Sequence, residues 1–115
     1  MPAIRVAGSG VALGEDVRPA HGLVSRTRGL MLRKGLASGS GIDIRPCGSI
    51  HMMFMLFPID AVFFDRDLRV TRVAHRVRPW IGLAFGGRGA KGVVELPVGA
   101  ANGVEPGHQL ALRPP

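Results

Sequence analysis

Short apolar runs separated by glycine and proline recur along this chain, and most of them have the spacing of β-strands. Residues 4–6 alternate between apolar and polar side chains, which is the pattern of a half-buried strand. The mainly apolar runs at 59–64 and 93–96 predict buried strands. Further short strands are expected at 11–17, 42–44, 49–53 and 108–112.

The longest predicted strand spans residues 68–77, and its apolar positions change face part-way along. Leu68 and Val70, near its start, occupy even-numbered positions, whereas Val73 and Val77, near its end, occupy odd-numbered positions. A bulge near Thr71–Arg72 would reconcile the two halves, because a bulge inserts one extra residue into a strand. The glycine-rich segment that follows, 82–92, is expected to be a mobile loop.

One segment has the periodicity of a helix. Between residues 22 and 34 the apolar side chains recur every three or four positions, with arginine and lysine between them. Arg33 and Lys34 would lie in the last turn, where basic side chains interact favourably with the helix dipole. Gly29 would lie inside the helix at a cost of about 1 kcal/mol relative to alanine, which favours close packing of another backbone at that point.

Length and composition then define the fold class. The 115 residues form one predicted domain, 1–115, large enough to bury about two-thirds of its unfolded surface. Seventeen glycines and nine prolines favour short elements joined by turns, and a single cysteine excludes an internal disulfide framework. We therefore expect an α+β, β-rich fold: a small, mostly antiparallel sheet curled into a partial barrel, with one main helix at 22–34 covering one face.

The charge pattern and the length of the apolar runs indicate which partners the protein binds and where in the cell it is expected. The net charge is +7, and thirteen of the fifteen basic residues are arginine, but no run of five basic residues occurs. This spread argues against nucleic-acid binding. The longest apolar run, residues 50–64, is too short and too polar to cross a bilayer, and no apolar export signal is evident at the N-terminus. A cytoplasmic monomer or weak dimer without membrane contact is expected.

Residues 47–65 are the most informative part of the chain. They hold the only cysteine, three of the five methionines and four of the five phenylalanines. Apolar residues interrupted by a few polar ones are typical of a pocket wall, and strand alternation would put His51, Met53 and Met55 on one face. Arginines nearby suit a polar or anionic small ligand. The predicted ligand-binding residues are His51, Met53, Met55, Asp60, Arg26, Arg33, Trp80 and Arg88.

Each of these residues also has a simpler structural interpretation. His51 would be a strand histidine that binds a backbone carbonyl, the methionines would fill the core, and Asp60 would accept bonds from turn amides. Two other functions stay open: a hydrolase that uses His51 with Asp60, and a module that docks onto a protein partner. Cys47 and His51 alone are too few to hold zinc, so neither a metal nor a cofactor is expected.

Three sequence pieces together resemble one known family. They are residues 26–33, residues 50–65, and residues 91–99, with a closing turn at 105–108. Their order and spacing resemble the bacterial and archaeal family catalogued as domain of unknown function 192, over about residues 20–112. The resemblance implies a β-rich domain with no established reaction. Many members have Trp-Met-Lys-Asn where this chain has His51–Phe54, so a role of that lysine and asparagine does not carry over.

Overall fold

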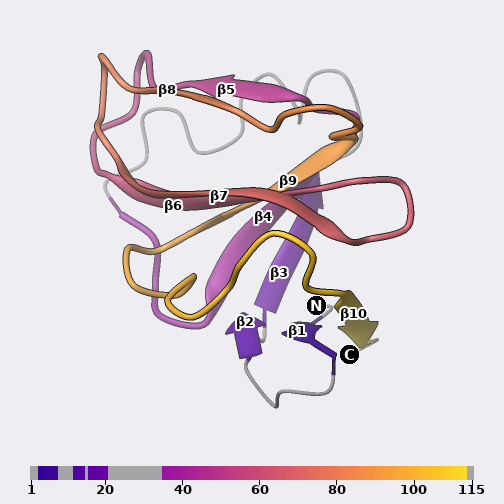
Figure 1. Ribbon diagram of the computed structural model, residues 1–115. Coiled ribbons are helices and arrows are strands. Elements are labelled where there is room, and N and C mark those ends of the chain that lie inside the picture. Colours follow the sequence, from indigo (N-terminus) through magenta and orange to yellow (C-terminus); the bar gives the residue numbers. More distant parts are fainter. Residues whose placement is uncertain (1–2, 8–11, 15, 21–34, 114–115) are drawn as a thin grey trace.

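The apolar runs form ten short strands among the residues that the structure describes (Figure 1). The structure is a computed structural model, which describes residues 3–7, 12–14, 16–20 and 35–113. The strands are β1 (Ala3–Val6), β2 (Ala12–Gly14), β3 (Asp16–Ala20), β4 (Ser40–Ile44), β5 (Ser49–His51), β6 (Ile59–Phe64), β7 (Val70–Val77), β8 (Leu83–Phe85), β9 (Gly92–Leu96) and β10 (Leu110–Arg113). The strands predicted at 4–6, 42–44, 59–64 and 93–96 are thus confirmed.

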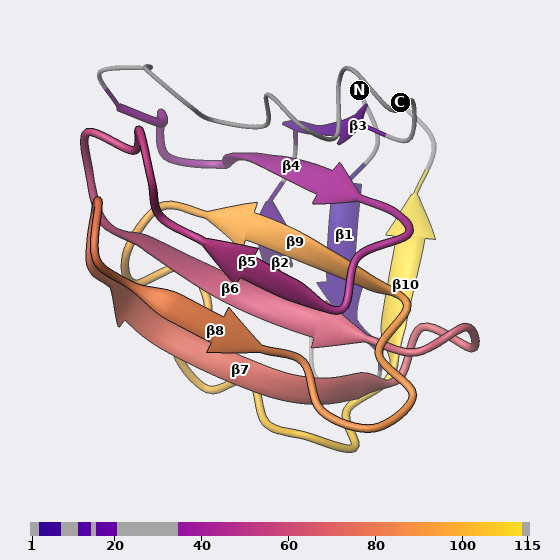
Figure 2. The ribbon, with the colours of Figure 1, turned by 90° about the horizontal axis from the view of Figure 1, so that it is seen from above.

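The ten strands form three sheets. The central sheet has the order β3-β4-β9-β6-β7, in which only the β3–β4 pair is parallel. A three-stranded sheet, β10-β1-β2, and a two-stranded sheet, β5-β8, lie on either side of it (Figures 1 and 2). Every residue of β6 and of β9 is buried, because each face of these strands is covered by another sheet.

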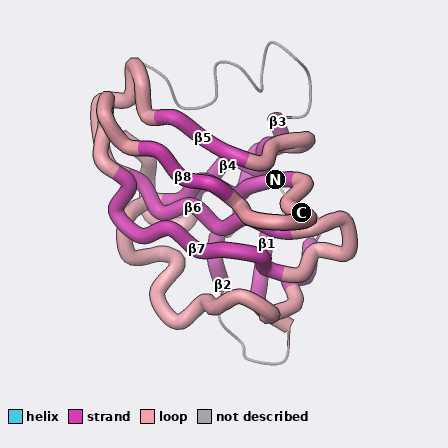
Figure 3. The backbone as a smooth tube through the Cα atoms, turned by 45° about the horizontal axis from the view of Figure 1, so that its top comes forward, coloured by secondary structure: helices cyan, strands magenta, loops and turns pink. Residues whose placement is uncertain are grey.

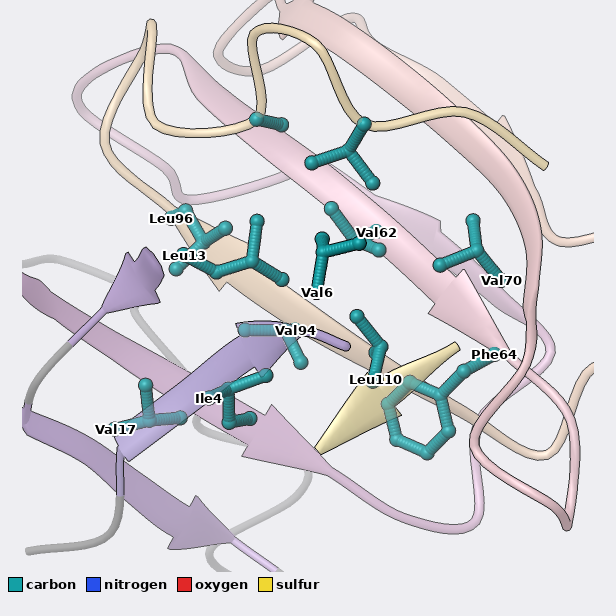
Figure 4. Packing of buried hydrophobic residues seen from close by; sticks show 12 residues of the cluster. Ile4, Val6, Leu13, Val17, Val62, Phe64, Val70, Val94, Leu96 and Leu110 are labelled. Atoms are coloured by element: carbon teal, nitrogen blue, oxygen red, sulfur yellow. The ribbon is translucent and has the colours of Figure 1, made fainter. Parts of the chain in front are cut away.

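Two apolar cores fill the spaces between the layers. One lies between the central sheet and β10-β1-β2 and includes Ile4, Val62, Val94 and Leu110, several of which are seen in Figure 4. The other lies between the central sheet and β5-β8, and the odd-numbered residues of β6 point into it. Alternation along β6 therefore sends successive side chains into different cores, which explains why this run is apolar at most positions.

The bulge predicted near Thr71–Arg72 is confirmed. In the β6–β7 pair, Phe63 lies opposite Arg72 and Phe64 lies opposite Val70, so Thr71 is the extra residue on β7. The register shift puts Val73 on the same core as Val70, as the change of parity in the sequence required. A second shift, between Ile59 and Ala61, sends Val77 into the other core.

The predicted fold class is wrong for the described residues. They contain strands and loops but no helix, and the end strands of the central sheet, β3 and β7, do not pair to close a barrel (Figure 3). The helix predicted at 22–34 lies outside the described residues. The physical reason for three open sheets is that β6 and β9 are apolar on both faces. A single curled sheet would bury only one face of each strand, whereas a layered arrangement buries both.

Of the two strands in the β5-β8 sheet, the sequence pattern predicted only β5. The segment 82–92, predicted as a mobile glycine-rich loop, contains β8, which pairs with β5. Three residues are too few for a periodicity signal, and β8 depends on its partner strand for its hydrogen bonds.

The close contact of Gly92 with the aromatic ring of Phe64 leads to a first prediction. A methyl group at Gly92 would lie 2.5 Å from Phe64 Cζ and 2.8 Å from Arg45 Cγ. We expect Gly92→Ala to lower the free energy of unfolding by about 2 kcal/mol, because the buried ring cannot move aside without strain. Urea unfolding measures this. Gly48→Ala is the control, since its nearest neighbour would be a carbonyl oxygen 3.8 Å away. An equal effect of the two substitutions would contradict the prediction.

Candidate functional site

Two connections between strands lie side by side at one end of the molecule. They are the β5–β6 connection, residues 52–58, and the β7–β8 connection, residues 78–82 (Figures 1 and 2). Backbone hydrogen bonds join them: the Trp80 N–H donates to the Met52 carbonyl at 2.7 Å, and the Met52 N–H donates to the Gly82 carbonyl at 3.0 Å. The two connections therefore form one structural unit.

This unit and the strand that follows it expose a concentration of large apolar side chains. Seven side chains are between 46% and 75% exposed, and we call them the apolar surface: Met53, Phe54, Leu56, Trp80, Ile81, Leu83 and Phe85. Their neighbours Ile50, Met52, Met55 and Ala84 are buried in the core beneath. Exposed apolar groups gathered on a small area, as opposed to scattered singly, mark an interaction site.

Two aromatic residues of the apolar surface have an unusual backbone. Phe54 and Trp80 have positive φ angles, 67° and 66°, which bulky residues rarely adopt. Their rings meet edge to face, with the centroids 5.3 Å apart and the planes at 61°. A strained backbone conformation persists only where its surroundings enforce it, so the two rings have a defined position.

The charge around the apolar surface is of one sign. The segments that carry the apolar surface, residues 52–58 and 78–85, contain no acidic residue. Arg76 and Arg78 are exposed and lead directly into the β7–β8 connection. The β6–β7 turn, with Asp65 and Asp67, lies at the opposite end of the molecule (Figure 2). The end that carries the apolar surface therefore favours negatively charged partners.

The structure brings together three of the predicted site residues. Met53 and Trp80 belong to the apolar surface, and His51 lies next to it, exposed and opposite Leu83 in the β5–β8 pair. Met55 does not share their face: it is 3% exposed and packs in the core. The predicted alternation fails because β5 ends at His51 and a turn follows.

The remaining predicted site residues lie elsewhere. Arg88 is exposed in the β8–β9 connection, beyond the far end of β8, while Arg26 and Arg33 lie outside the described residues. Asp60 points to the core on the other face of the central sheet, since its neighbours Ile59 and Ala61 point toward β5-β8. His51 and Asp60 are thus on different sides of that sheet.

Asp60 is an almost fully buried carboxylate with backbone partners. It is 1% exposed, and it accepts hydrogen bonds from the N–H groups of Arg76 at 3.0 Å, Gly99 at 3.0 Å and Ala101 at 3.2 Å. His75 Nδ1 lies 3.7 Å from Asp60 Oδ2. Sequence reasoning missed His75, because a second register shift, which puts both His75 and Arg76 opposite Asp60, decides which residues of β7 approach this carboxylate. The arrangement ties β7 to the turn after β9.

An open depression of about 560 Å³ lies beside this carboxylate. Its lining consists of Asp60, His75, Arg76, Val98, Gly99, Asn102 and Gly103. This lining offers histidine, arginine and amide groups to a ligand but contains no serine, threonine or cysteine that could act as a nucleophile.

Glu95 is the other buried carboxyl group of chemical interest. It is the fourth of the five residues of β9 and lies opposite Ile42 of β4 and Ala61 of β6. Burial raises its pKa from 4.5 to about 7, because the charged form loses its hydration. Its protonation therefore changes near neutral pH, a property that the sequence pattern alone did not indicate.

Among the described residues, no three histidine, cysteine or acidic side chains lie close enough to hold a metal ion. The Cys47 thiol donates to the Ser49 carbonyl at 3.0 Å. Within residues 3–7, 12–14, 16–20 and 35–113 there is no helix of the length and apolarity that crossing a bilayer requires.

Comparison with known proteins places this architecture in a family. The sequence model of domain of unknown function 192, described as uncharacterized ACR, matches residues 4–112. This chain belongs to that family. Its fold resembles the crystal structure of a protein of unknown function from Novosphingobium aromaticivorans, with a TM-score of 0.79 and 23% identity over 95% of this chain and 83% of that one. At this identity the likeness shows the fold alone.

Two curated relatives of this chain come from archaea, and both are called UPF0127 proteins. The one from Thermococcus sibiricus is 38% identical over 87 residues, which is 72% of this chain and 55% of the relative. The one from Pyrococcus horikoshii is 33% identical over 94 residues, which is 79% of this chain and 80% of the relative. The chain thus spans about half the length of the first relative and most of the second.

Proposed function

We propose that this member of the family is a docking module. It binds through the apolar surface to a partner that presents apolar groups together with negative charge. The observation that carries the proposal is the gathering of seven large, exposed apolar side chains on two adjoining connections and β8. Removing such side chains from water on binding is favourable in proportion to the apolar area covered.

The charge of the protein supports a negatively charged partner. The net charge is +7, and the segments that carry the apolar surface contain Arg78 but no acidic residue. A second copy of this chain is disfavoured as the partner, because it would bring two basic surfaces together. Positive charge next to an apolar contact raises both the encounter rate and the selectivity for anionic partners.

The other functions have less support. A small-ligand pocket around His51 would need walls, whereas His51 is exposed on the outer face of the β5-β8 sheet. A hydrolase that uses His51 with Asp60 would need the two groups in contact, whereas the central sheet separates them. Both oxygens of Asp60 already accept backbone hydrogen bonds, which suits a structural role.

The proposal predicts that the folded protein binds a dye that is both apolar and anionic. Anilinonaphthalene sulfonate has this chemistry, and Trp80, the only tryptophan, can transfer energy to a dye bound beside it. We expect saturable binding that is about tenfold weaker in Ile81→Asp, because that variant loses apolar contact and gains a like charge. Ile81 is 75% exposed, so the substitution leaves the core intact.

Pro106→Asp is the matched control. Pro106 is also exposed and apolar, but it lies beside Gly107, whose N–H donates to the Val70 carbonyl at the end of β7 far from the apolar surface. The control should bind the dye as the unmodified protein does. If both variants bind equally well, or if the unmodified protein does not bind, the apolar surface is not a docking site.

A further inference from the structure

We infer that the partner of the apolar surface is an anionic lipid bilayer, which the β5–β6 and β7–β8 connections enter from the water side. This inference rests on the proposed docking function and names its partner. The sequence led us to expect no membrane contact, because no run was long and apolar enough to cross a bilayer. Contact with one side of a bilayer requires no such run.

The shape of the site favours a bilayer over a protein. Ile81, the most exposed apolar side chain, lies in a connection that projects from one end of the molecule, and Leu83 follows it at the start of β8 (Figures 1 and 2). The neighbouring connection adds Met53 and Phe54 beside them. A bilayer accepts a projecting apolar tip of any shape, whereas a protein partner must supply a complementary hollow.

The aromatic pair has the chemistry of a membrane interface. The indole of Trp80 has an apolar body and a polar N–H, and such rings concentrate at the boundary between lipid and water. The edge-to-face contact with Phe54 and the positive φ angles of both residues keep the rings at the tip. Without that backbone conformation, collapse of the rings against the protein would remove them from water.

The charges are placed for a negatively charged membrane surface. Arg78 is exposed at the start of the β7–β8 connection, next to the tip, and Arg76 is exposed two residues earlier, at the depression beside Asp60. Asp65 and Asp67 lie at the opposite end of the molecule, where they would point away from the membrane (Figure 2). Basic side chains near an anionic leaflet add attraction that salt weakens.

The test measures binding of the whole chain to phosphatidylcholine vesicles with and without phosphatidylglycerol. Insertion should shift Trp80 emission to shorter wavelength and produce saturable binding to the anionic vesicles. We expect binding at least about tenfold weaker to pure phosphatidylcholine, and weaker again at high salt. Ile81→Asp and, on the other connection, Met53→Asp should each lower anionic-vesicle binding by about tenfold or more. Pro106→Asp, at the opposite end of β7, should bind normally.

The outcomes separate this inference from the docking proposal. Loss of vesicle binding in Ile81→Asp and Met53→Asp, with unfolding midpoints unchanged, supports the bilayer. Binding of the dye and of an acidic amphipathic peptide, but not of anionic vesicles, overturns the bilayer and leaves a protein partner for the docking module. Failure of the dye, the peptide and the vesicles overturns both proposals. Vesicle binding that is unchanged in both variants also overturns the inference, because the contact then lies elsewhere.

Discussion

Asp60→Asn is expected to lower the free energy of unfolding by about 3 kcal/mol, the value for losing hydrogen bonds to a buried charged group. Oδ1 of Asp60 accepts from one backbone N–H and Oδ2 accepts from two. An asparagine has one oxygen and one NH₂ group, so either orientation places a donor against a backbone donor. The substitution keeps the volume, so lost hydrogen bonding and not a cavity causes the effect.

Urea unfolding followed by circular dichroism measures this change. Asp67→Asn is the matched control, because Asp67 is exposed in the β6–β7 turn and its substitution should cost less than about 0.5 kcal/mol. Amide hydrogen exchange adds a local measure: Arg76, Gly99 and Ala101 should lose protection first. A small effect on stability, similar to that of the control, would mean that Asp60 does not hold β7 to the turn after β9.

Raising the pH from about 4.5 to about 7 is expected to destabilise the protein through Glu95, by up to about 3 kcal/mol. The pKa of Glu95 is raised to about 7 in the folded protein, whereas 4.5 is its ordinary value. In this interval the unfolded chain has already released the proton that the folded protein still holds. The stabilisation is therefore complete below pH 4.5 and is lost as the pH rises to 7.

Glu95→Gln isolates this contribution. Glutamine has the shape of the protonated carboxyl group but does not titrate, so the variant should gain stability relative to the unmodified protein as the pH rises. The free energy of unfolding is measured for both proteins at several pH values between 4 and 8. Glu105→Gln, at an exposed position, should follow the unmodified protein. Parallel pH profiles for Glu95→Gln and the unmodified protein would contradict the raised pKa.

The candidate site shows where sequence reasoning stopped. The sequence pointed to residues 47–65 and to Trp80, and Met53 and Trp80 do belong to the apolar surface. It did not indicate Leu83 and Phe85, because β8 lies in a glycine-rich segment that has strand conformation only through its pairing with β5. It also placed Met55 with Met53, since alternation was extended past His51 into a turn. Both errors concern pairing between distant residues, which local periodicity does not contain.

The sequence by itself determined the family, the buried strands and the bulge. The sequence pieces that match the family are local. The apolar runs at 59–64 and 93–96 are long enough to show that these strands are buried. The change from even-numbered to odd-numbered apolar positions indicates the extra residue in β7. Only the tertiary structure decided how the strands divide into three sheets, since this depends on which faces cover one another. It alone decided that His51 and Asp60 lie on different sides of the central sheet, and that the two connections meet at one end. Exposure is set by contacts between residues far apart in the chain, so the apolar surface became visible only in three dimensions.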